Sequence, residues 1–428
     1  MGSFDKAIAH LSALRRKFEG LLEAAREKSA ADPAARAARR TVLRELTAFG
    51  SNPGNLRMFV HAPERLPSQA PLVVALHGCG QTADDYDCGS GWSALADRLG
   101  FAVVYPQQQP ANNPKTCFSW FLPGHTARGR GEARSIQQMV EHAIAAFGID
   151  RGRVFVTGLS AGGAMTAVML ATYPELFAGG AIIAGVPYGS ARSVQQAFDA
   201  MFTEQTNPAD VLGDRVRSAS NHPGPWPKIS VWHGTADPIV KPSNSEEIIR
   251  QWLDVHGLSA VPSTQESIGG HDRRVWTNAD GETLIEAFSI AGMAHGVPLA
   301  TSGEHSYGAT GAFFHDAGIS STHRIAKFWR LDEGVTESNA AALPPIRATG
   351  GAVAAAAEAA GRSDDAREER YRPKPGAAAA FLDPNAVIAA AFKAAGLPAP
   401  EVPKTAAAAQ AAAVPFIQAA LKAAGLKR

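Results

Sequence analysis

The sequence predicts an α/β fold in which a mostly parallel central sheet is flanked by helices. Between about residues 54 and 330, short runs rich in β-branched and aromatic residues alternate with longer runs of helical periodicity. This alternation is typical of parallel strands joined by helical crossovers. The chain has 428 residues, whereas single cores usually stop growing at about 250–300 residues. We therefore expect one large domain with extensions outside it.

The first expected element is an amphipathic helix within an N-terminal extension, residues 1–49. Its apolar residues recur at spacings of three and four and so share one helical face: Phe4, Ile8, Leu11, Leu14, Phe18, Leu21 and Leu22. We expect this face to pack on the protein's own domain or on a second subunit. Contact with a membrane or polymer surface is the alternative, and the acidic residues on the polar face weigh against it.

The main domain is expected at residues 50–335. Its strands are predicted at 58–61, 72–76, 101–105, 154–157, 181–184, 229–232 and 284–289. Helices are predicted at 92–99, 136–147 and 161–172, the last ending before Tyr173 and Pro174. Residues 187–227 interrupt the alternation with a mixed helical stretch. We expect an insertion there, over the edge of the sheet, that forms a wall of the substrate pocket.

After Arg330 the composition changes to alanine, proline and charged residues. Residues 336–428 are therefore expected to form a flexible Ala/Pro-rich tail. An internal repeat within it, IAAAFKAAGL at 388–397 and IQAALKAAGL at 417–426, predicts two short amphipathic helices. Self-association or contact with a granule surface through these terminal helices is the alternative to a flexible tail.

Composition excludes several classes of function. The 41 lysines and arginines nearly balance the 40 aspartates and glutamates, so nothing in the charge indicates a nucleic-acid partner. The first thirty residues contain no apolar core of a signal peptide, and no segment reaches transmembrane length; taken alone, this predicts a cytoplasmic protein. Cys79, Cys88 and Cys117 form no CxxC pair. His233 and His295 lack the spacing of a zinc site, so we expect no metal and no cofactor.

Residues 158–162 read GLSAG and match the pattern GxSxG. A predicted strand comes directly before them and a predicted helix directly after, which is the turn required by a nucleophile elbow. Glycines on both sides allow a tight turn that exposes the hydroxyl of Ser160 above the sheet. Ser160 is therefore the candidate nucleophile; an ordinary glycine-rich start of a helix is the alternative.

A serine hydroxyl needs a base to take its proton, and that base needs a carboxylate to hold the correct tautomer. Asp237, in HGTADPIV at 233–240, follows the strand at 229–232, and His295, in GMAHGVPL at 292–299, follows the strand at 284–289. Loops at the carboxyl ends of parallel strands meet at one edge of the sheet. We therefore assign His295 as general base and Asp237 as its partner. Other candidates fit less well: His271, His305, His315 and Asp254.

The developing negative charge on the substrate oxygen needs hydrogen-bond donors. One candidate is the backbone N–H of Ala161, directly after the nucleophile. The other is the N–H of Cys79, in the turn that follows the strand at 72–76. His77 in the same turn is expected to hold the backbone in place rather than transfer protons.

Six motifs occur together in order: LHGCGQ (76–81), GWSALADRLGFAVVYPQQ (91–108), CFSWF (117–121), VFVTGLSAGGAM (154–165), HGTADPIV and GMAHGVPL. The chain thereby resembles the polyhydroxybutyrate-depolymerase-type esterases, which also include feruloyl and acetylxylan esterases, over residues 50–332. The resemblance implies an α/β-hydrolase domain that acts on esters through an acyl-enzyme, with Trp120 and Phe121 near the substrate crevice. Packing beneath the loop is the alternative for these two aromatic residues.

Many members of this family are secreted, so the resemblance leaves the localisation open. Cys79 and Cys117 flank the expected site, and we hypothesise that they pair in an oxidising compartment. The first hypothesis for function is hydrolysis of polyhydroxybutyrate or short hydroxyalkanoate oligomers. The alternatives are a feruloyl or acetylxylan esterase and a non-catalytic granule-binding protein; the intact Ser160, Asp237 and His295 set weighs against the last.

Overall fold

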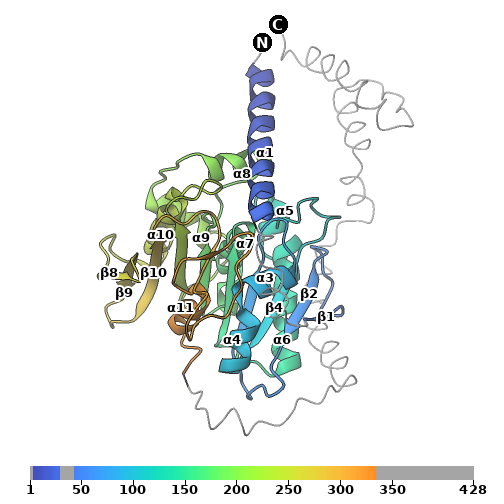
Figure 1. The fold of residues 1–428 in the computed structure, drawn as a ribbon, viewed down its shortest axis with the longest axis vertical. Helices are drawn as coiled ribbons and strands as arrows, with labels where there is room; N and C mark the ends of the chain where they lie inside the picture. Colours follow the sequence, from blue (N-terminus) through green and yellow to red (C-terminus); the bar gives the residue numbers. More distant parts are fainter. Residues whose placement is uncertain (1–2, 29–42, 334–428) are drawn as a thin grey trace, which may run out of the picture. The chain divides into compact units, whose positions relative to one another are not determined.

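The computed structural model describes residues 3–28 and 43–333, and a ten-stranded sheet lies at the centre of this part (Figure 1). The strand order is β1-β2-β4-β3-β5-β6-β7-β10-β9-β8. Bounds in chain order are β1 Arg44–Leu46, β2 Arg57–His61, β3 Leu72–Leu76, β4 Ala102–Gln107, β5 Val154–Leu159, β6 Gly179–Ile183, β7 Lys228–Gly234, β8 Thr264–Ile268, β9 His271–Thr277 and β10 Thr283–Ile290. A separate parallel pair joins β11 Val297–Leu299 to β12 Phe314–Asp316.

The central strands run parallel from β4 through β3, β5, β6 and β7 to β10, whereas the pairs at both edges are antiparallel. Every residue of β3, β5 and β6 is buried. Strands covered on both faces read as continuous apolar runs, such as LVVAL in β3. The predicted mostly parallel sheet flanked by helices is confirmed.

Helices cover both faces of the sheet. On one face lie α6 Gly131–Phe147, α7 Ala161–Thr172, α9 Ala209–Arg217 and α10 Ser243–His256, which contact one another in sequence. On the other lie α3 Ala83–Ser90, α4 Trp92–Leu99 and α11 Ser321–Phe328. The remaining helices are α1 Ser3–Lys28, α5 Pro123–Thr126, α8 Val194–Phe202 and the 3₁₀ turn Pro174–Leu176. No helix in the described ranges combines the length and the apolar character needed to span a bilayer.

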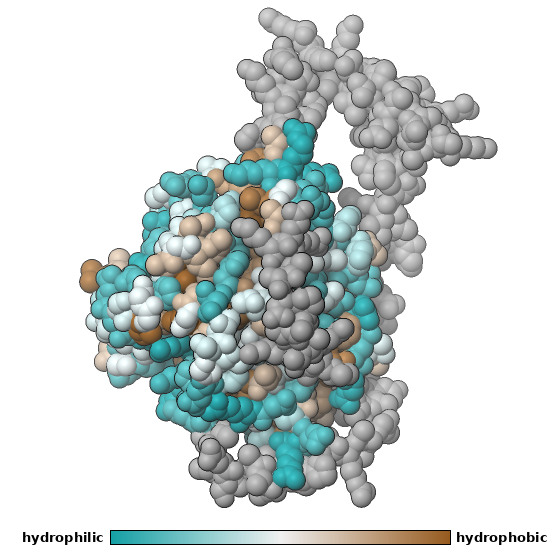
Figure 2. All heavy atoms as spheres, viewed as in Figure 1, coloured by the Kyte–Doolittle hydropathy of each residue, from teal (hydrophilic) through white to brown (hydrophobic). Residues whose placement is uncertain are grey.

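The part of the apolar face of α1 whose side chains are described packs on this protein's own domain, which is the first of the two expectations; Phe4, Ile8 and Leu11 lie outside the described side chains. Phe18 and Leu22 are buried, and the ring of Phe18 meets that of Phe198 on α8 edge to face, with centroids 6.0 Å apart. The ammonium group of Lys17 lies 4.9 Å from the ring centroid of Phe202, also on α8. The described part of the face shown in Figure 2 is mostly hydrophilic. Across all described residues, the exposed large apolar side chains are those of Val194, Val211 and Val261.

The interior elements follow the sequence predictions closely, and the edges do not. The strand at 72–76 and the helices at 92–99 and 161–172 have the predicted bounds, and the other predicted strands differ by at most two residues at either end. The helix predicted at 136–147 begins earlier, at Gly131. The short strands β1, β8, β9, β11 and β12 were not predicted. Strand β8 (TQESI) is almost wholly exposed and lacks an apolar alternation that could reveal it. The expected tail, 336–428, with its boundary near 335 and its repeat, lies outside the described residues.

Candidate active site

Ser160 occupies the turn between β5 and α7 in a conformation that non-glycine residues rarely adopt. Its dihedral angles are φ 58° and ψ −117°, and its N–H donates to the carbonyl of Ile183 at 2.9 Å. The flanking glycines make the turn feasible. A β-carbon at Gly158 would lie 2.5 Å from the carbonyl carbon of Gly162, and one at Gly162 would collide with the carbonyl oxygen of Leu76. The partly exposed Ser160 is thus held above the end of the sheet.

Asp237 and His295 are joined at the same edge of the sheet, after β7 and β10. Nδ1 of His295 donates to Oδ2 of Asp237 at 2.7 Å, and both residues are only 4% exposed. The other oxygen, Oδ1, accepts the N–H groups of Ile239 and Val240 at 2.8 and 2.9 Å. Because Nδ1 donates, Nε2 carries the lone pair that a general base needs.

Burial by itself would raise the pKa of Asp237. The neighbouring His295, with His233, outweighs this and holds that pKa well below its usual range. Asp237 is therefore a carboxylate at neutral pH, which suits a group that orients a histidine and stabilises its protonated form.

The structure bonds two of the three candidate residues and places the third at the same edge. Strand β6 alone separates β5, which leads to Ser160, from β7, which leads to Asp237. Within the described residues, no hydrogen bond links the hydroxyl of Ser160 to His295. Nε2 of His315 lies 2.9 Å from the carbonyl oxygen of His295 and so holds the backbone of that residue. His315 thus has a structural contact.

His233, for which the sequence predicts no role in catalysis, contacts the same carboxylate. It is 3% exposed, and its Nε2 lies 2.9 Å from the carbonyl of Val240 and 3.2 Å from Oδ2 of Asp237. The spacing His233 to Asp237 within HGTAD is the signal that could have indicated it. Of the weaker candidates, His271 forms hydrogen bonds to backbone groups through both ring nitrogens. Asp254, on α10, forms an ion pair with Arg217 on α9.

The two candidate oxyanion donors lie at the start of α7 and in the turn that follows β3. Ala161 is the first residue of α7, where a helix leaves its N–H groups without internal partners. Cys79 lies in a turn fixed by neighbours: the N–H of Gly78 donates to Gln81 at 2.8 Å, and that of Gly80 to the carbonyl of Lys115 at 2.7 Å. Across the described residues, neither the N–H of Cys79 nor that of Ala161 meets a protein acceptor.

His77 holds this turn, as expected. Its Nδ1 lies 2.8 Å from the carbonyl of Gly78, and its Nε2 accepts the N–H of Gln108 at 3.1 Å. Burial lowers the pKa of His77 to about 4. A neutral histidine with both ring nitrogens engaged has no capacity left for proton transfer.

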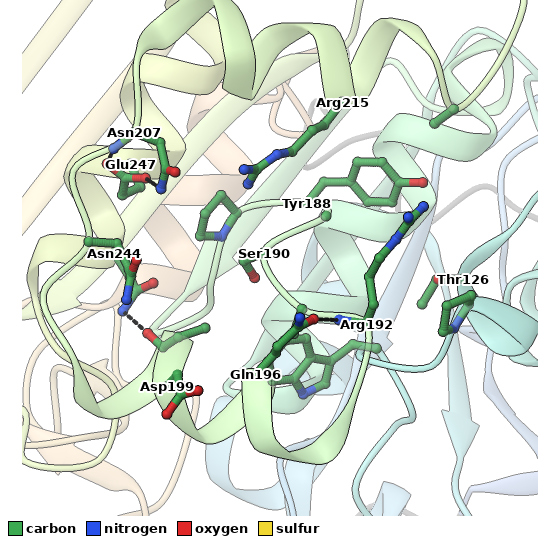
Figure 3. A pocket seen from close by; sticks show the side chains of 18 of the residues that line it. Thr126, Tyr188, Ser190, Arg192, Gln196, Asp199, Asn207, Arg215, Asn244 and Glu247 are labelled. Carbon is green, nitrogen blue, oxygen red and sulfur yellow. Dashed lines mark hydrogen bonds between the residues drawn. The ribbon is translucent and has the colours of Figure 1, made fainter. Parts of the chain in front are cut away.

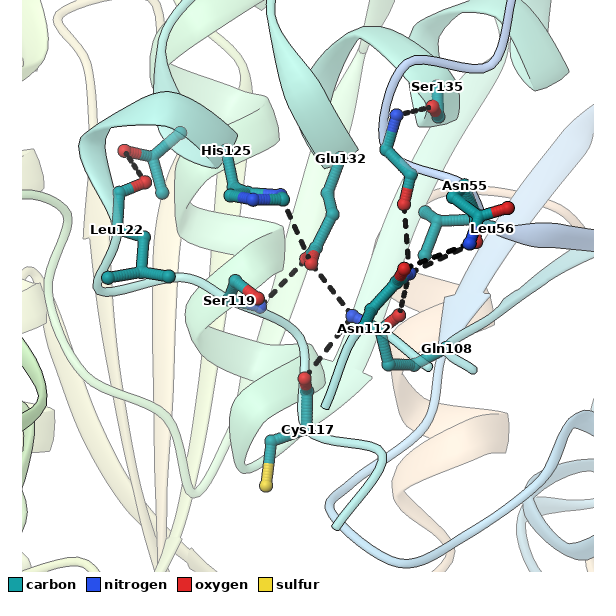
Figure 4. Close-up of polar contacts among 12 residues, drawn as sticks. Asn55, Leu56, Gln108, Asn112, Cys117, Ser119, Leu122, His125, Glu132 and Ser135 are labelled. Atoms are coloured by element: carbon teal, nitrogen blue, oxygen red, sulfur yellow. Dashed lines mark hydrogen bonds and ion pairs between the residues drawn. The ribbon is translucent and has the colours of Figure 1, made fainter. Parts of the chain in front are cut away.

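The hypothesised pair is present as a disulfide between Cys79 and Cys117. It ties the turn of Cys79 to the loop that carries Trp120. A buried carboxylate anchors the same loop (Figure 4): Glu132 accepts from the N–H of Ser119 at 2.7 Å and from the side chain of Gln108 at 2.7 Å. Two independent links therefore hold this loop beside the candidate oxyanion donors.

Trp120 and Phe121 stack edge to face with ring centroids 5.4 Å apart. Trp120 is 9% exposed and lines a cavity of about 830 Å³, whereas Phe121 is half-buried and does not line it. Most of the cavity wall comes from residues 187–219, with further residues from α5 and α10 (Figure 3). The expected insertion thus forms a cavity wall, although Ser160, Asp237 and His295 do not line this cavity.

His125 contacts Glu132 as well. Its Nδ1 lies 3.3 Å from the carboxylate, and this partner, partly offset by burial, raises the pKa of His125.

No cluster of three or more histidine, cysteine or acidic side chains suited to a metal occurs in the described residues.

Comparison with known proteins gives consistent matches. Residues 59–274 match the family model described as esterase PHB depolymerase. The chain is 47% identical to a poly(3-hydroxyalkanoate) depolymerase C of Paucimonas lemoignei, over 68% of this chain and 70% of that protein. It is 38% identical to an acetylxylan esterase of Coprinopsis cinerea, over 60% and 69%, and 31% identical to a feruloyl esterase B of Talaromyces stipitatus, over 61% and 74%.

Among solved structures, an acetyl xylan esterase from Aspergillus awamori superimposes with a TM-score of 0.58 at 25% sequence identity. The match covers 68% of this chain and the whole of that one.

Proposed function

The chain belongs to the esterase PHB depolymerase family and is a carboxylic ester hydrolase, and from this premise we propose that Ser160, His295 and Asp237 perform the hydrolysis. The observation that carries the proposal is the 2.7 Å hydrogen bond between Nδ1 of His295 and Asp237. It leaves Nε2 as the acceptor at the edge of the sheet where the elbow presents Ser160.

In the proposed reaction, Nε2 of His295 takes the hydroxyl proton of Ser160 while the hydroxyl oxygen of Ser160 bonds to the ester carbonyl carbon. The tetrahedral intermediate then expels the alcohol, which receives that proton from His295. Water repeats the sequence: His295 takes a proton from it, the acyl carbon gains the hydroxyl, and Ser160 leaves with its proton restored. The products are one alcohol and one acid.

The N–H groups of Cys79 and Ala161 serve in this proposal as donors to the anionic oxygen. Loss of one such donor costs about 3–4 kcal/mol of transition-state stabilisation in hydrolases that use them. The disulfide of Cys79 supports the role, because preorganised donors stabilise charge better than mobile ones.

For the substrate, we propose hydroxyalkanoate esters or their short oligomers, with polyhydroxybutyrate as the parent polymer. The identity to a hydroxyalkanoate depolymerase exceeds that to the acetylxylan and feruloyl esterases in the comparison. Feruloyl and acetylxylan esters form the second candidate class. In the described part of α1, the buried Phe18 and Leu22 pack on the protein itself, which supports a structural role for that stretch rather than granule contact.

The test compares wild type with Ser160→Ala on p-nitrophenyl butyrate, followed by a panel of hydroxybutyrate oligomers, feruloyl esters and acetylated xylan. We expect turnover by wild type only and the highest kcat/KM on the oligomers. Equal rates for wild type and Ser160→Ala would defeat the proposed mechanism, whereas a preference for feruloyl or acetyl esters would replace only the substrate.

A further inference from the structure

The cavity beside the insertion contains two arginines without acidic partners. Arg215 on α9 is half-buried, and Arg192, just before α8, is exposed. Across the described residues, neither guanidinium forms an ion pair or a hydrogen bond. By contrast, Arg217, two positions further on α9, pairs with Asp214 and Asp254 at 2.8 and 2.6 Å. The arginines of the cavity are thus available for a ligand.

The acidic side chains of the cavity are already engaged. Glu247 accepts from the N–H and the side-chain amide of Asn207 at 3.1 and 2.6 Å and also pairs with Arg250. Asp199 accepts from Gln195 at 3.0 Å, and in Figure 3 it lies below Ser190, whereas Arg215 lies above it. The positive charges of the two arginines are therefore not paired by these carboxylates.

A third group points to a polar ligand. The hydroxyl of Ser190 is buried and has no hydrogen-bond partner among the described residues, although it lines the cavity. In Figure 3 it lies among the lining side chains, below Arg215 and Tyr188. A buried hydroxyl without a partner is costly, and a bound acceptor would remove that cost.

The cavity walls continue from the two segments that frame the candidate active site. Tyr188 and Ser190 follow within seven residues of Ile183, whose carbonyl accepts the N–H of Ser160. On the other side, Trp120 follows Cys117, which is bonded to Cys79. Both segments that contact the candidate active site therefore also contribute residues to the wall of this cavity.

We propose that the cavity binds the free carboxylate of an acidic ester substrate, namely the acid end of a short hydroxy-acid oligomer. The proposal rests on the proposed function and specifies its substrate. The planar guanidinium of Arg215 matches a carboxylate with two parallel hydrogen bonds, Arg192 adds positive charge, and Ser190 donates its hydroxyl. The enzyme should then have a higher kcat/KM for oligomers with a free carboxylate than for the same oligomers with that carboxylate converted to a methyl ester.

The experiment compares the trimer of 3-hydroxybutyrate as the free acid and as its methyl ester. We measure kcat/KM for both with wild type, Arg215→Gln and Arg192→Gln. Arg217→Gln is the matched control, because it removes the same charge from α9 outside the cavity. Wild type should favour the acid, and the acid-to-methyl-ester ratio should fall about tenfold in Arg215→Gln, through KM, and remain at the wild-type value in Arg217→Gln.

Two outcomes would overturn this inference while p-nitrophenyl butyrate is still cleaved. One is a wild type that does not favour the acid; the other is an Arg215→Gln ratio equal to that of Arg217→Gln. A wild type without turnover of p-nitrophenyl butyrate would contradict the proposed function instead. Titration of the trimer acid into Ser160→Ala, with and without Arg215→Gln, tests the binding separately: equal affinities would reject the site.

Discussion

Replacing Asp237 by asparagine tests how the carboxylate controls His295. In the folded protein, Oδ1 accepts two backbone N–H groups, from Ile239 and Val240, while Oδ2 faces His295 and His233. In the Asp237→Asn variant, the single side-chain oxygen must keep the two backbone bonds, because an NH₂ group there would face two donors. The NH₂ group of the new amide therefore faces the histidines.

The size of the expected loss in kcat follows from the change in the tautomer of His295. Facing an NH₂ group, Nδ1 of His295 must become an acceptor, so its proton moves to Nε2 and that nitrogen can no longer take the proton of Ser160. Loss of the correct tautomer lowers kcat by about 10⁴-fold, or about 5.5 kcal/mol of barrier. The loss of charge-assisted hydrogen bonds should also lower the free energy of unfolding by about 1.5–3 kcal/mol.

The assay is kcat on p-nitrophenyl butyrate for wild type, Asp237→Asn and a control, Asp254→Asn, with melting temperatures for all three. Asp254 offers a carboxylate on α10 that pairs with Arg217 away from the site, so its variant should retain wild-type kcat. If Asp237→Asn stays folded and retains a kcat within about tenfold of wild type, the proposed role of the carboxylate is wrong.

Three further variants test the surroundings of the site. His233→Asn should lower kcat by about ten- to a hundredfold through loss of a contact to Asp237, and a kcat equal to wild type would show that His233 is only packing. Cys117→Ser removes a disulfide that joins residues 38 positions apart, so the free energy of unfolding should fall by about 4 kcal/mol and the melting temperature with it. An unchanged melting temperature would contradict a stabilising role of this disulfide. The raised pKa of His125 means that its pairing with Glu132 stabilises the fold fully below about pH 6.5 and is lost as pH rises through the folded value. Wild type should therefore exceed His125→Asn in melting temperature by more at about pH 6 than at about pH 9, and an equal difference would reject the pairing.

The strands in the interior of the sheet could be predicted because they are buried on both faces and therefore consist of consecutive apolar residues. The run LVVAL of β3 is apolar throughout, and α7 begins directly after a glycine-flanked serine and ends before a proline. The strands β9 and β8, at one end of the sheet, carry no such pattern. In β9, for example, two arginines lie in the middle of the strand, where their side chains form ion pairs with Glu286 and Glu246.

The candidate site divides in the same way. Chain order and strand ends were enough to select Asp237 and His295, which the structure joins. The contact of His233 depends on how the loop 234–240 folds back, and the anchoring role of Glu132 depends on a segment more than ten residues away along the chain. Local sequence does not encode such contacts. The unpaired state of Arg192 and Arg215 likewise becomes visible only once every possible partner in the described part of the chain has a position.

The central claim is that Ser160 carries the acyl group during the reaction. Rapid quenching of wild type with p-nitrophenyl butyrate, followed by intact-mass measurement and peptide mapping, tests it directly. We expect one butyryl group, located on the peptide that contains Ser160. Turnover that proceeds while this peptide stays unmodified in every quenched sample, or an adduct on a different residue, would contradict it.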